Sequence, residues 1–155
     1  MKWITREKAK VDRIACPWLI KHFVDERAEF LFVPKEKVQE VATKEGAIPF
    51  DVPGAELHHF EADGKEYVSF DAIMRKYDIK DQALLELAKI VRGADAKIDD
   101  TSVESAGLEA AAIGFRDISP NDDENLKLQF PLYDALYKYC QLKLTGSQKI
   151  EHAVH

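Results

Sequence analysis

The apolar residues follow one pattern up to about residue 68 and a different pattern beyond it. In the first part, short runs such as "KWIT" and "EFLFVP" are bounded by charged residues or proline, which is typical of strands. Beyond residue 68, apolar residues recur every three or four positions, as along one face of a helix. This order predicts an α+β domain, with a small sheet from the N-terminal half packed against a mainly helical C-terminal half.

The same patterns predict the individual elements. Before residue 69 we expect strands over 2–5 and 29–34 (the latter buried on both faces), a helix over 35–46 that ends at Gly46, and a hairpin with strands near 56–61 and 65–68. After residue 68 we expect four helices: one capped by Ser69, one through Leu84 and Val91 that ends before Gly93, one through Leu108 and Phe115, and one through Leu132 and Tyr139.

Composition limits the class of protein. The chain has 155 residues, 46% of them hydrophobic, which suits one domain. We expect it to span 1–144, with a mobile tail over 145–155. The net charge of −6, without a basic block, argues against nucleic-acid binding. Two cysteines, no visible signal peptide and no membrane-spanning apolar run predict a cytoplasmic protein with no membrane partner, and leave oligomer formation open.

The stretch "KVDRIACPWLIKHF" raises a chemical question. Because Pro17 lacks an amide hydrogen, it fits the first position of a helix, and we expect that helix to run from Cys16 to about Val24. Cys16 would then lie at the positive helix end beside Arg13, which favours a thiolate or a bound oxyanion. The alternative is a buried cysteine that packs as a small hydrophobe.

The second motif is "HHFEAD". On a strand, His59 would share one face with Glu61 and Asp63, while His58 would point to the other. An imidazole and a carboxylate on one face suit a divalent metal such as zinc, manganese or iron. The alternative is a solvated hairpin with a chance histidine pair. Further ligands would have to come from elsewhere in the chain, and the candidates are Asp51, Asp95 and Glu104.

These motifs resemble the chromate resistance protein ChrB family, specifically its C-terminal domain standing alone. The likeness begins at "VDRIACPWLIKHFVDERAEFLFVP" and continues through "IPFDVPGAELHH", "AGLEAAAIGF" and "FPLYDALYKYC", about residues 11–140. It implies a role in chromate resistance in bacteria that also carry a chromate efflux transporter, without implying a reaction. The DNA-linked N-terminal region of full-length members is not carried over.

The resemblance also implies site residues. Cys16 and Arg13 become the reactive pair, and Asp12, Arg13 and Trp18 become contacts for chromate or another small oxyanion. The matched positions beyond the first motif are Asp51, His59, Glu104, Tyr133, Asp134 and Tyr137. Because this hairpin is longer than expected for the family, Glu61 and Asp63 become weaker ligand candidates. The predicted metal set is therefore His59, Asp51 and Glu104, with His58 as the alternative histidine.

Three functions follow as hypotheses. The first is a cytoplasmic accessory or sensor domain in chromate resistance that binds an oxyanion, a divalent metal or both. The second is a metal-dependent enzyme that acts on chromate or on reactive oxygen species. The third is a structural interaction domain in which Trp18 is the centre of the packing.

Overall fold

The fold is α+β, as the sequence predicts. The computed structural model describes residues 1–96 and 102–154, with side chains described up to residue 146. The elements are β1 (Lys2–Arg6), α1 (Asp12–Phe23), β2 (Glu29–Val33), the 3-10 helix η1 (Lys35–Lys37), α2 (Val38–Glu45), β3 (Ile48–Pro49), β4 (Phe60–Ala62), β5 (Lys65–Tyr67), α3 (Ser69–Lys76), α4 (Gln82–Ala96), α5 (Val103–Ile118) and α6 (Asp122–Val154).

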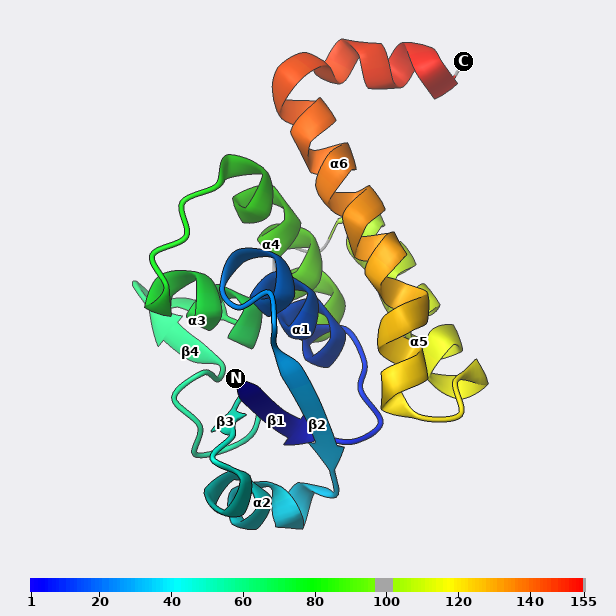
Figure 1. Cartoon of the computed structure of the whole chain (residues 1–155). Helices are drawn as coiled ribbons and strands as arrows, with labels where there is room; N and C mark the ends of the chain where they lie inside the picture. The colour runs from blue at the N-terminus through cyan, green and yellow to red at the C-terminus, as the bar shows by residue number, and fades with distance from the viewer. Residues whose placement is uncertain (97–101, 155) are drawn as a thin grey trace.

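A three-stranded parallel sheet organises the N-terminal half, in the order β2-β1-β3. Parallel neighbours need crossover connections, and α1 and α2 lie in those connections (Figure 1). The central strand β1 buries Trp3, Ile4 and Thr5 completely. Strand β2 lies at the edge and is partly exposed, so the expectation that it is buried on both faces is wrong. A strand is covered on both faces only where helices lie over both, which holds better at the centre of a sheet than at its edge.

The helices enclose α1. Helix α1 contacts α3, α4 and α6, and α4 in turn contacts α5 and α6. Figure 1 shows α6 running beside α5 and continuing past the body of the domain. The largest fully buried side chains of the main core come from all parts of the fold: Trp3, Trp18, Phe50, Phe70 and Tyr133. No helix in the described part of the chain has the length and hydrophobicity needed to cross a bilayer.

Helix α1 begins at Asp12, four residues before the expected start at Cys16. The Val11 carbonyl accepts hydrogen bonds from Ile14 N at 3.0 Å and Ala15 N at 2.7 Å, and these bonds close the first turn. Pro17 therefore lies inside the helix, where its missing amide hydrogen leaves one carbonyl of the preceding turn without its helical donor. The predicted boundary is wrong because tertiary support for the loop outweighed the local preference of proline.

Other boundaries also differ. The hairpin is confirmed, but β4 begins at Phe60, so His59 precedes the strand and the alternation argument does not apply to it. Ser69 is the first residue of α3 and not its cap. Helix α4 passes through Gly93, which is buried within it, and ends at Ala96. The last helix extends through Val154 with non-helical dihedral angles at Gly146, and the mobility of the tail stays a prediction.

Two glycines give a matched test of the backbone assignment. Gly46 ends α2 with φ 64°, whereas Gly107 lies inside α5, and a Cβ at either would meet nothing within 4 Å. Gly46→Ala should therefore lower the free energy of unfolding by about 1 kcal/mol, because alanine is strained in this conformation. Gly107→Ala should raise it by about 0.5–1 kcal/mol, because alanine favours a helix. Urea unfolding measures both, and equal signs would contradict the assignment.

Candidate metal centre

The candidate site lies at the carboxyl edge of the parallel sheet. The chain leaves β1 through a short loop that leads to Asp12, the first residue of α1, and Asp51 follows two residues after the end of β3. Because β2 and β3 lie on opposite sides of β1, the two connections diverge at this edge. Ligands in open parallel sheets bind at such a divergence, where the connecting segments leave space between them.

His59 lies among three carboxylates. Its Nε2 atom is 3.7 Å from Asp12 Oδ2, 3.4 Å from Asp51 Oδ1 and 3.3 Å from Asp95 Oδ2. The donor atoms of Asp12, His59 and Asp95 all lie within 4.8 Å of one another. Donors about 2.1 Å from a shared cation are roughly 3–4 Å apart, so small movements would let these groups coordinate one ion.

Asp12 links α1 to α3. Its carboxylate is completely buried, and it accepts hydrogen bonds from Ser69 N at 2.8 Å and Phe70 N at 3.1 Å. These are amide groups of the first turn of α3, which have no acceptor within the helix. The acceptor that α3 requires therefore comes from another helix, which is why Ser69 does not need to cap it.

Asp51 is held by backbone geometry and by Ser69. Its φ angle is 51°, in the left-handed region that aspartate tolerates better than most residues. Asp51 Oδ1 accepts a hydrogen bond from Ser69 Oγ at 2.7 Å. The start of α3 therefore positions two of the three carboxylates, one through backbone amides and one through a hydroxyl group.

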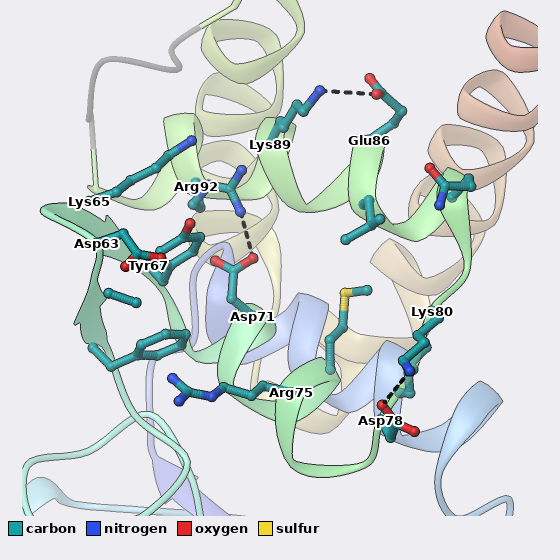
Figure 2. Close-up of a pocket in the computed structure, with 16 residues that line it drawn as sticks. Asp63, Lys65, Tyr67, Asp71, Arg75, Asp78, Lys80, Glu86, Lys89 and Arg92 are labelled. Carbon is teal, nitrogen blue, oxygen red and sulfur yellow. Dashed lines mark hydrogen bonds and ion pairs between the residues drawn. The ribbon is translucent and has the colours of Figure 1, made fainter.

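Asp95 comes from the last turn of α4. One turn earlier, Arg92 Nη1 donates to Asp71 Oδ1 at 2.6 Å (Figure 2). The other oxygen, Asp71 Oδ2, accepts a hydrogen bond from Val68 N at 3.0 Å. Both charged side chains are at most 10% exposed. This ion pair ties α4 to the start of α3 and so holds the third carboxylate near the other two.

The cluster has more negative than positive charge. The three carboxylates, Asp12 first, raise the pKa of His59 to about 12. Burial, followed by the nearby charge of Asp51, raises the pKa of Asp12 to about 7. Without a cation, the negative charge of the three acidic groups is therefore only partly balanced, by the protonated imidazole of His59 and by partial protonation of Asp12. A divalent cation would supply the missing positive charge.

Arg13 adds a cation beside the cluster. It is 9% exposed, and its Nε atom has no hydrogen-bond partner among the described residues. Burial lowers the pKa of Arg13, while the charges of Asp51 and Asp95 act in the opposite direction. Its position next to Asp12 agrees with a role near the site, although its predicted role as an oxyanion contact stays a prediction.

The cluster includes only some of the predicted ligands. His59 and Asp51 come together, and they are joined by Asp95, which the sequence offered only as a candidate. Glu104 lies in the first turn of α5, where its charge acts on Cys140, and it is not among the grouped ligand atoms of the described residues. The ring of His58 is centred 5.2 Å from the ring of His59, but its atoms are likewise outside the group.

Sequence reasoning missed Asp12 as a candidate metal ligand. The resemblance to the ChrB family implies an oxyanion contact for this residue and no metal. The signal that could have found it is the position of two aspartates after two parallel strands, Asp12 after β1 and Asp51 after β3. The two aspartates are near each other only because β1 and β3 are adjacent in the sheet, and the sequence does not show which strands pair.

The environment of Cys16 differs from the prediction. The residue is completely buried inside α1, and its Sγ–H donates to Asp12 Oδ1 at 3.3 Å. Burial, followed by the charge of Asp12, raises the pKa of the thiol well above its ordinary value. The expected thiolate at a helix start is therefore wrong, because the helix start is elsewhere and the neighbouring charge is negative.

Trp18 lies in the contact between α1 and α6. It is 1% exposed, its Nε1 atom donates to Asp134 Oδ1 at 2.9 Å, and its ring centroid lies 5.6 Å from that of Tyr137. These contacts place Trp18 in packing between helices, and they do not place it at the cluster around His59. A direct contact between Trp18 and a bound oxyanion stays a prediction.

A groove away from the His59 cluster has a different electrostatic character. It is a groove of about 720 Å³ between the hairpin, α3 and α4 (Figure 2). Its charges are largely matched within the groove, as in the ion pairs Lys89–Glu86 at 3.0 Å, Lys80–Asp78 at 3.4 Å and Arg92–Asp71. The cluster at His59 differs because three acids there share one imidazole.

The fold and the cluster define an α+β domain with a carboxylate–histidine group at the edge of a parallel sheet. Residues 3–140 match the family described as ChrB, C-terminal domain, and the chain belongs to this family. It is 34% identical over 140 residues to the Protein ChrB of Cupriavidus metallidurans, an alignment that covers 89% of this chain and 40% of that relative. The chain therefore matches less than half of that longer protein. No solved structure matches.

The two thiols give a direct test of the site description. Burial raises the pKa of Cys16 well above its ordinary value and that of Cys140 to about 11. Because the thiolate is the reactive form, neither should react with a disulfide reagent at pH 8 in the folded chain. Both should react after unfolding in guanidinium. Rapid labelling of native Cys16, identified by mass spectrometry, would contradict the buried position.

Proposed function

We propose that this chain is a divalent-cation-binding accessory or sensor domain of bacterial chromate resistance. The observation that carries the cation part is the position of His59 Nε2 within 3.7 Å of three carboxylates. The side chains of Asp12 and Asp51 are only 0% and 10% exposed, so solvent screens the repulsion between their carboxylates poorly. The connection to chromate is what the resemblance to the ChrB family implies.

Manganese or iron suits the donor set better than zinc. The cluster offers carboxylate oxygens and one imidazole nitrogen, whereas the nearest thiol, Cys16, is protonated and directed at Asp12. Oxygen-rich sites favour harder divalent metals such as Mn²⁺, and zinc sites more often use nitrogen and sulfur. We therefore favour Mn²⁺ or Fe²⁺ among the three metals that the sequence suggests.

An oxyanion would bind through the cation. Three neighbouring carboxylates repel a dianion such as chromate, so direct binding at the metal-free cluster is unfavourable. A bound divalent cation reverses the local sign, and Arg13 next to Asp12 adds a further positive charge. The His59 side chain is 39% exposed, which leaves access from solvent to such a cation.

Calorimetric titration with Mn²⁺ tests the cation site. The chain should bind one ion, and Asp95→Asn should weaken the affinity at least about 10-fold, because removing one charged ligand of a small set typically has that effect or more. Glu104→Gln is the matched control, a carboxylate-to-amide change on another helix, and should leave the affinity within twofold. No binding by the unchanged chain, or loss of binding only in Glu104→Gln, would refute the proposed site.

A second titration tests the order of binding. Chromate should bind the Mn²⁺-loaded chain and show no measurable affinity for the metal-free chain, as followed by equilibrium dialysis. Cys16→Ser should not change the affinity, because the buried thiol donates to Asp12 Oδ1, whereas His59 Nε2 approaches the other oxygen, Asp12 Oδ2. Chromate binding that needs Cys16 and no metal would instead support the oxyanion pocket expected from the sequence.

The second candidate function is a metal-dependent enzyme that acts on chromate or reactive oxygen species. The partial exposure of His59 favours it, because catalytic metals keep open coordination positions. Consumption of chromate or superoxide by the Mn²⁺- or Fe²⁺-loaded chain, lost in Asp95→Asn, would establish an enzyme. Binding without turnover would leave the accessory or sensor role.

A further inference from the structure

The loop that connects β1 to Asp12 is strained. Val11 has φ 44° and ψ −95°, and Lys8 has φ 61°. A β-branched residue such as valine is rarely found at positive φ, because its side chain is crowded against the backbone there. Such strain persists only where neighbouring groups hold the backbone in place.

Helix α6 supplies those groups, from more than a hundred positions later in the chain. Asp122 accepts hydrogen bonds from Lys8 N at 3.0 Å and Ala9 N at 2.7 Å. Asn125 Nδ2 donates to the Ala9 carbonyl at 3.1 Å. We call Asp122, Asn125 and Tyr133 the α6 clamp, because the Tyr133 hydroxyl in turn donates to the Val11 carbonyl at 3.3 Å.

The composition of the clamp is unusual for simple helix packing. Asn125 and Tyr133 are at most 1% exposed, and Gln129, which is also fully buried, donates to Asn125 Oδ1 at 2.6 Å. Burying polar groups is unfavourable unless each has a partner, so apolar residues would pack α6 at lower cost. These polar side chains instead lie along one face of the helix, and the three of the clamp bond to the backbone of a single loop.

We propose that the α6 clamp positions Asp12 for the cation, an inference that rests on the proposed function. Asp12 directly follows Val11, and its carboxylate is bonded to the amides of α3. The residue is thus held from two directions: through its backbone by α6 and through its carboxylate by α3. Holding a ligand in place before the ion arrives reduces the entropy lost on binding.

The coupling must be reciprocal. If the clamp increases the affinity for the cation, the cation stabilises the clamped loop by the same factor. Binding of Mn²⁺ should therefore slow amide hydrogen exchange at Lys8 and Ala9, whose amides donate to Asp122. Neither residue belongs to the cation cluster, so this protection would not arise from direct coordination.

Two tyrosine variants on α6 make the test specific. Tyr133→Phe removes the hydroxyl that holds Val11, whereas Tyr137→Phe removes a hydroxyl that donates to Asp81 Oδ2 at 2.7 Å, away from the loop. Each variant removes one hydroxyl group from α6 and leaves the ring in place. We expect Tyr133→Phe to weaken Mn²⁺ binding about fivefold, which corresponds to about 1 kcal/mol for one hydrogen bond. Tyr137→Phe should stay within twofold of the unchanged chain.

The readouts separate this inference from the proposed function. If the unchanged chain binds no Mn²⁺, the proposed function fails, whatever the clamp does. If it binds Mn²⁺ and the two tyrosine variants bind equally well, the clamp inference is overturned and the cation site stands. Faster exchange at Ala9 in metal-free Tyr133→Phe, with Tyr137→Phe unchanged, supports the clamp by itself.

A second variant covers the case in which Tyr133→Phe does not fold. Asp122 is at the less buried start of α6, and Asp122→Asn keeps one oxygen acceptor for the two loop amides. We expect faster exchange at the amide that loses its acceptor and weaker Mn²⁺ binding, with the circular dichroism spectrum unchanged. Unaltered exchange and unaltered affinity in this folded variant would overturn the inference.

Discussion

The Asp12 carboxylate is the interaction on which the rest of the site depends. It accepts hydrogen bonds from the first amides of α3 and from the Cys16 thiol. One of its oxygens lies 3.7 Å from His59 Nε2. A fully buried carboxylate is costly unless such donors surround it. The same bonds that make its burial tolerable also fix the relative positions of α1 and α3, so the fold and the site share one set of contacts.

Charge imbalance then explains why a cation fits the site. In the groove between the hairpin, α3 and α4, acidic side chains form ion pairs with basic ones, as Asp71 does with Arg92 at 2.6 Å. Around His59, three acids share one imidazole, and the pKa values of Asp12 and His59 both rise in response. Natural cores rarely keep such an arrangement for stability alone, because unpaired buried charge destabilises the fold. A functional requirement is the simpler physical account.

Much of the fold could be predicted from local patterns. The strand at residues 2–5, the end of α2 at Gly46 and the hairpin before residue 69 are confirmed, because each follows from backbone preferences or from hydrophobic periodicity. The start of α1 could not be predicted. Proline favours the first turn of a helix only when other terms are equal, and the loop before Asp12 receives hydrogen bonds from α6 that no local pattern reveals.

The sequence by itself determined the class of the fold, the family and the presence of histidine and aspartate in the relevant motifs, because these depend on residue type and spacing. Only the tertiary structure decided which acids meet His59. It brought Asp12 and Asp95 to the cluster and left Glu104 on α5, because side chains distant in sequence meet only through strand pairing and helix packing. It likewise buried Cys16, since a helix that begins at Asp12 turns that thiol into the core.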